Sequence, residues 1–87
     1  MTGPRQAFAR TANAAQRVAG VIAARHRGDF DGANALLDGL DDHTRAAGAV
    51  FLADLAVALL AQGTGEPIDQ VAADLSLRIA GLAPFTD

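Results

Sequence analysis

The side chains best suited to hold a charged partner are arginines in the first third of the chain. Residues 1–27 carry five of the seven arginines and no acidic residue, whereas all ten acidic residues follow. Residues three or four apart on a helix share a face, which predicts one row of polar residues: Arg10, Asn13, Arg17 and Arg27. Such a row can follow a phosphate backbone or contact an acidic protein surface. The alternative is a solvated face whose arginines pair with acids of neighbouring helices.

Two features weaken the nucleic-acid interpretation. The row contains no aromatic side chain to stack on a base, and residues 28–87 carry ten acids against two arginines, which would repel an anionic polymer. A helix-turn-helix would need the third predicted helix to contact DNA. That helix starts with Asp41, Asp42 and His43 and continues as an apolar segment, so acids stand where cations and amides are needed.

The histidines and acids offer little for a metal or catalytic site. His26 and His43 are the only histidines, and the best local set joins His26 with Asp29 and Asp31. A helix end followed by a capping Asp explains that set without a metal. The chain has no Cys, and Ser76 stands on no Gly-rich elbow. We expect no catalytic, metal-binding or cofactor-binding residues, and a protein that is not an enzyme.

Helical periodicity and capping residues predict an all-α fold, a small bundle of four helices. Pro4 suits the first turn of a long first helix, and Gly28 can end it in the left-handed conformation. Asp29 then caps a short second helix, and a tight corner at residues 39–41 leads into the third. The loop 63–65 precedes the fourth. The predicted ranges are 5–27, 30–38, 42–62 and 67–82.

The third predicted helix, residues 42–62, is apolar nearly all round. Leu52, Leu55 and Leu59 form one strong face, and Val50, Val57 and Leu60 form a second. A helix that is apolar on all sides is expected to be buried on all sides, so this helix is predicted to be central and most buried. Asp54 lies within it, either at a solvent edge or in a close contact with an arginine.

Length and composition indicate one domain spanning residues 1–87, with 83–87 as a short C-terminal tail. Without Cys, a domain this small depends on well-packed helices or on association. The polar N-terminus does not resemble a signal peptide. The longest apolar run, 46–61, is shorter than the roughly 20 residues that span a bilayer. We therefore expect a cytoplasmic protein without a membrane span.

Excess apolar helix surface suggests the function. A second apolar face on the third helix, and Leu77 off the main stripe of the fourth, have no obvious cover in so small a chain. We expect a non-catalytic protein–protein interaction or homo-oligomerisation module, whose partner is a second copy or another helical protein. The candidate interface residues are Val50, Val57, Leu60 and Leu77. The alternative function is a small accessory regulator that contacts nucleic acid or an acidic protein through the arginine row.

Overall fold

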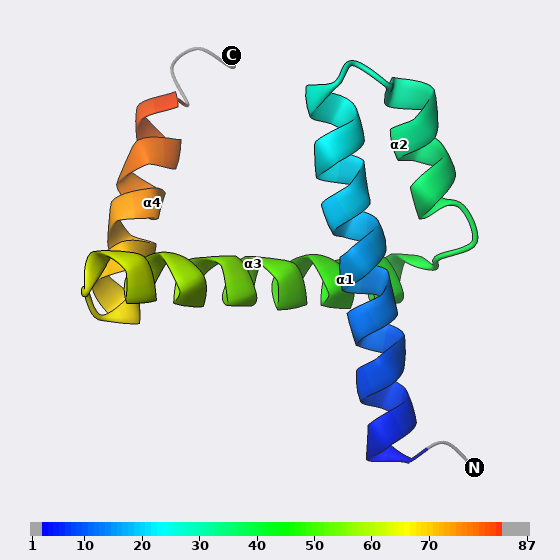
Figure 1. Cartoon of the computed structure of the whole chain (residues 1–87), viewed down its shortest axis with the longest axis horizontal. Helices are drawn as coiled ribbons and strands as arrows, with labels where there is room; N and C mark the ends of the chain where they lie inside the picture. The colour runs from blue at the N-terminus through cyan, green and yellow to red at the C-terminus, as the bar shows by residue number, and fades with distance from the viewer. Residues whose placement is uncertain (1–2, 83–87) are drawn as a thin grey trace. The chain divides into compact units, whose positions relative to one another are not determined.

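A computed structural model describes residues 3–82 of the chain. These residues form four helices and contain no strand (Figure 1). The predicted all-α fold of four helices, with a short second one, is confirmed. The predicted tail, 83–87, lies outside the described residues. The helices are α1 (Pro4–His26), α2 (Phe30–Leu37), α3 (Asp42–Thr64) and α4 (Ile68–Leu82).

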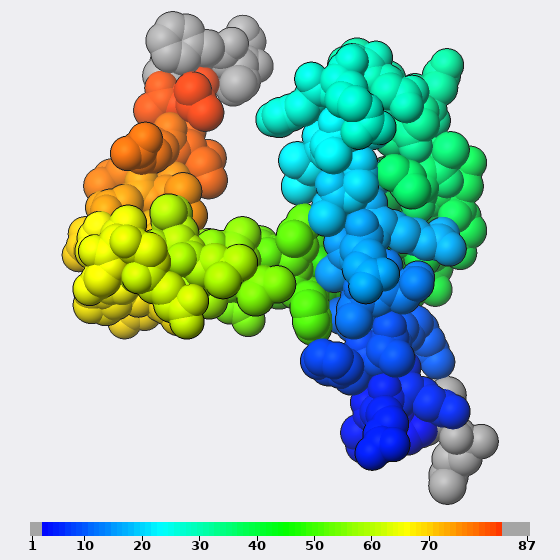
Figure 2. All heavy atoms as spheres, in the orientation of Figure 1, coloured from blue at the N-terminus to red at the C-terminus, as the bar shows by residue number. Residues whose placement is uncertain are grey.

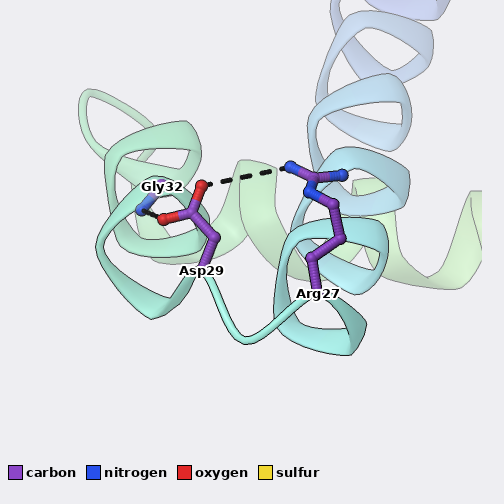
Figure 3. Close-up of polar contacts among 3 residues, drawn as sticks. All are labelled: Arg27, Asp29 and Gly32. Carbon is purple, nitrogen blue, oxygen red and sulfur yellow. Dashed lines mark hydrogen bonds and ion pairs between the residues drawn. The ribbon is translucent and has the colours of Figure 1, made fainter.

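Local capping residues set the helix ends as predicted. Gly28 follows α1 with φ +80°, a backbone conformation that favours glycine. Asp29 caps α2, where its carboxylate accepts a hydrogen bond of 2.9 Å from the amide of Gly32 (Figure 3). Asp41 caps α3 in the same way and accepts a 2.8 Å hydrogen bond from the amide of Thr44. Short-range hydrogen bonds therefore fix these boundaries.

The end of α3 differs slightly from the prediction. The helix continues through Gly63 and Thr64, which were predicted to lie in a loop, and Gly65, whose φ is +75°, follows its last residue. The Thr64 hydroxyl donates to the Leu60 carbonyl at 3.1 Å, and the Gly65 amide donates to the Ala61 carbonyl at 2.9 Å. The two extra residues make α3 23 residues long.

The chain divides into two compact units, Met1–Asp54 and Leu55–Asp87, with the boundary inside α3. Unit 1 contains α1, α2 and the first half of α3. Unit 2 contains the second half of α3 and α4. The two units share one continuous helix, α3. The assignment of residues 1–87 to a single domain stays a prediction.

In unit 1, α1 and α2 lie side by side (Figures 1 and 2). Gly20 of α1 allows this approach, since a Cβ added there would lie 3.0 Å from a methyl of Leu36. Ala24 of α1 and Ala33 of α2 are buried. The sequence offered a solvated face as one interpretation of the side of α1 that carries Arg17. This side packs on α2 because small residues there let the short helix come close.

The first half of α3 crosses α1 at a second glycine. A Cβ on Gly48 would lie 2.8 Å from both the carbonyl carbon and the Cβ of Ala14, closer than packed side chains allow. Beside this crossing, the rings of Phe8 and Phe51 make an edge-on contact with centroids 5.6 Å apart. Glycine at position 48 therefore sets how near the two helices come.

Two arginines hold the turn between α2 and α3. Arg45 donates from Nε to the Leu40 carbonyl at 3.0 Å and from a terminal nitrogen to the Leu37 carbonyl at 3.2 Å. Arg17 donates to the Asp38 carbonyl at 3.3 Å. Leu37 is the last residue of α2, Asp38 caps the helix, and Leu40 lies in the turn. The Leu37 carbonyl also accepts from the Leu40 amide at 3.2 Å, so the two arginines add donors to the end of α2 and to the turn.

Burial of α3 differs from the expectation. The buried apolar residues of the described part are five alanines and Val71, and no large side chain is fully buried there. Of α3 itself, only Gly48 and Ala61 are buried. The helix is central in that it belongs to both units, yet most of its surface is open. The apolar side chains of α3 were expected to be buried by the other helices. In unit 1, the contact with α1 buries α3 only around Gly48.

Candidate interaction surface

The arginine row does not form one continuous patch. Arg10 and Asn13 are exposed on α1, but Arg17 is half-buried and contacts the end of α2. Arg27 lies beyond the last residue of α1 and forms an ion pair with Asp29 at 4.0 Å (Figure 3). Spacing alone placed these residues on one side of a helix. In the structure, α2 packs against the part of α1 that carries Arg17, so Arg17 is not part of an open row.

Most charged side chains among residues 3–82 form no ion pair there. The Arg27 and Asp29 pair is the ion pair found within 4.0 Å among residues 3–82. Asp54 is exposed and lies at a groove in unit 1 with Val50 and Phe51, without an ion pair in the described part of the chain. The imbalance between a basic N-terminal third and an acidic remainder is therefore not resolved by internal pairing.

The predicted interface residues are placed as follows. Val50 is 67% exposed, Leu60 47% and Leu77 72%, whereas Val57 is half-buried. Val50 belongs to unit 1 and the other three to unit 2. All except Val57 thus lie on open surface, but they do not belong to one unit.

Unit 2 exposes more apolar side chains than the predicted interface residues alone. On α4, apolar residues at helical spacing form a stripe: Ile68, Val71, Leu75, Ile79 and Leu82. Val71 is buried and Leu75 half-buried, but Ile79 remains 68% exposed and Leu82 62%. On α3, Leu55 and Leu59 are also open. We call the five residues on α4 the α4 stripe.

A groove of about 340 Å³ opens between the end of α3 and α4. Leu60, Val71 and Leu75 supply its apolar wall, and the charged side chains of Asp74 and Arg78 stand at its edge. Asp74 accepts a 3.1 Å hydrogen bond from the Gln70 side chain. Neither Asp74 nor Arg78 forms an ion pair within residues 3–82. The groove combines an apolar wall with two acids, Glu66 and Asp74, and one base, Arg78, four residues after Asp74.

The histidines lie in separate places. His26 borders a shallow hollow with Ile22, Arg25 and Phe30, and His43 lies at the unit 1 groove near Asp54. Within the described ranges no three His, Cys, Asp or Glu side chains gather as metal ligands would. His26 and His43 line different hollows, so they do not form one site.

By length and composition, α3 could cross a membrane, and it is the one helix among residues 3–82 that meets this criterion. The apolar run alone was too short, but the 23-residue helix is longer than the run. A core helix of a soluble protein would meet the same criterion and be mostly buried, whereas only 11% of this segment is. Most of this helix is therefore open within residues 3–82.

Comparison with known protein families, curated proteins and solved structures found no match to this chain.

Proposed function

We propose that the chain is a non-catalytic, cytoplasmic protein–protein interaction module that acts as a homodimer. One observation carries the proposal: unit 2 leaves most of its large apolar side chains open. The described part of unit 2 buries only Ala61 and Val71. Seven larger residues stay between 47% and 72% exposed: Leu55, Leu59, Leu60, Ile68, Leu77, Ile79 and Leu82.

Covering this surface stabilises the folded chain. Full burial of a large apolar side chain is worth about 1.5 to 3 kcal/mol, so covering the open half of one contributes about 1 kcal/mol. Soluble proteins that leave many large apolar side chains open usually use them at an interface. A second copy presents the same surface, and a two-fold pairing covers both copies at once.

A protein partner is favoured over a lipid bilayer. Asp54 lies near the middle of α3, and a carboxylate at that depth costs about 2.5 to 3.5 kcal/mol for insertion. In addition, Gly48 of α3 packs on Ala14, which lies on α1 between Arg10 and Arg17. Inserting α3 would either bring those arginines into the bilayer or break the contact between α1 and α3.

The alternative function, a regulator that contacts nucleic acid or an acidic protein, has less support. Arg17 and Arg27 already contact acceptors within the chain, which leaves Arg10 and Asn13 as the open members of the row. Phosphate contacts would give binding that falls steeply with salt. A titration of labelled duplex DNA at low salt tests this function, and we expect no binding.

Light scattering over a range of concentrations tests the proposed function. We expect the wild-type chain to form dimers and Leu60→Glu to weaken them at least tenfold, because the new charge would be buried in the interface. Ala80→Glu is the matched control, since Ala80 is exposed on α4 and does not line the groove. Circular dichroism verifies that both variants remain helical.

A second arm adds vesicles of phosphatidylcholine alone or mixed with phosphatidylserine. We expect the wild-type chain to remain dimeric and unbound. A chain that stays monomeric in buffer and floats with vesicles would replace the proposed function by membrane association. A chain that is monomeric in buffer and does not bind vesicles would contradict the proposed homodimer.

A further inference from the structure

The open helix surface of unit 2 carries information about how two copies meet. We infer that they pair through α4 in antiparallel order, about a two-fold axis at Leu75, with Asp74 of each copy facing Arg78 of the other. This inference rests on the proposed homodimer and adds its orientation. Three observations support it: the spacing of the α4 stripe, the exposure of its members Ile68, Ile79 and Leu82, and the order of the charges beside it.

The spacing of the α4 stripe is symmetric. Its members follow one another at intervals of three, four, four and three residues, so Leu75 stands at the centre. When two such helices run antiparallel about Leu75, Ile68 meets the second copy's Leu82 and Leu75 meets its counterpart. Ile79 then covers the turn that carries the second copy's Val71. Each open residue of the α4 stripe thus meets an apolar position of the other helix, whereas Leu77, on the opposite side of α4, stays outside this pairing.

The charges favour antiparallel over parallel order. Asp74 and Arg78 each precede a stripe residue, so they lie on the same flank of the stripe, at the edge of the groove. In an antiparallel pair like flanks meet, whereas in a parallel pair each flank meets the opposite one. Parallel order would place these two charges against the flank that carries Ala72 and Ser76. Antiparallel order places opposite charges together twice.

The register that pairs the α4 stripes and the register that pairs Asp74 with Arg78 agree closely. Pairing of the stripe centres the axis on Leu75, and pairing of Asp74 with Arg78 centres it on Ser76. The relative shift is two residues, about 3 Å along the helix, which a long arginine side chain spans. Arg78 is exposed and Asp74 half-buried at the groove edge, so both can reach a second copy.

Single charge reversals mixed in trans test this arrangement. In Asp74→Arg every meeting pair becomes two cations, and in Arg78→Asp it becomes two acids, so we expect each variant alone to dimerise about tenfold more weakly. Mixed together, the two variants restore both opposite-charge pairs. We expect a heterodimer within about threefold of wild-type affinity. Native mass spectrometry resolves it, because the two variants differ in mass.

Asp69→Arg is the control, since it makes the same charge change on α4 but lies outside the groove lining and on the other flank of the stripe. We expect its dimer affinity to stay within about threefold of wild type. If both reversals dimerise like wild type, the antiparallel pairing is wrong and the homodimer stands. If both weaken the dimer but mixing does not restore it, the charges act within their own helix and the pairing is again wrong. A wild-type monomer would instead overturn the proposed function itself.

Discussion

Adding one methyl group at Gly48 should separate α1 from α3. In a helix interior, Gly to Ala normally stabilises by about 0.8 to 1 kcal/mol. At position 48 the new Cβ would lie 2.8 Å from the carbonyl carbon and Cβ of Ala14, against an ordinary contact of about 3.5 to 4 Å. No side-chain rotation can relieve a contact with backbone atoms, so the two helices must move apart.

Overpacking of this kind costs about 1 to 3 kcal/mol, and the immovable neighbour places Gly48→Ala in the upper part of that range. After the helix-propensity gain, we expect a net loss of about 1 to 2 kcal/mol. For a domain of this size that lowers the melting temperature by roughly 4 to 15 °C. Thermal unfolding by circular dichroism measures it, at one fixed protein concentration because dimer stability depends on concentration.

Two other glycines provide a graded control. A Cβ on Gly63, also in α3, meets nothing within 4 Å, so Gly63→Ala should be neutral or stabilise by up to about 1 kcal/mol. A Cβ on Gly20 meets only the methyl of Leu36, which can rotate, so Gly20→Ala should fall between the two. If Gly48→Ala proves as stable as Gly63→Ala, the described crossing of α1 and α3 is wrong.

The polar contacts of unit 1 give three further expectations. Arg45→Met removes the Nε donor from the Leu40 carbonyl, for which the structure shows no backbone donor within residues 3–82, and should lower the free energy of unfolding by about 1 to 2 kcal/mol in urea titrations. Asp29→Ala removes the cap of α2 and should cost about 1 kcal/mol by the same measurement. The hydrogen bond from the Thr44 amide lowers the pKa of Asp41 below its ordinary value of 3.8, so its stabilising effect is present at neutral pH and lost as the pH falls through and below that value. Asp41→Asn keeps an acceptor at every pH, so the acid-side loss of stability should be smaller in this variant than in wild type.

Sequence reasoning predicted the local features of the fold well. The helix ends follow from Asp29, Asp41 and the two glycines at 28 and 39, because capping depends on neighbours within a few residues. The α4 stripe was likewise visible as a period of three and four. These features need no knowledge of which helix packs on which.

Long-range features could not be predicted in the same way. Apolar composition indicated burial of α3, but burial depends on how much cover the other helices provide, and hydrophobicity alone does not specify that cover. Spacing placed Arg17 in a solvated row, whereas the docking of α2 gives it a carbonyl partner. Gly20 and Gly48 did carry a usable signal, since a glycine inside a helical pattern often marks a close approach of backbones.

Sedimentation equilibrium on the wild-type chain tests the central claim most directly. Between about 1 and 100 µM, a range suited to a dimer of micromolar affinity, we expect the apparent mass to rise from near 8.9 kDa toward twice that value. The data should fit a single monomer–dimer equilibrium. A mass that stays at 8.9 kDa over the whole range would contradict the account, because the open stripe of α4 would then remain exposed in solution without a second copy.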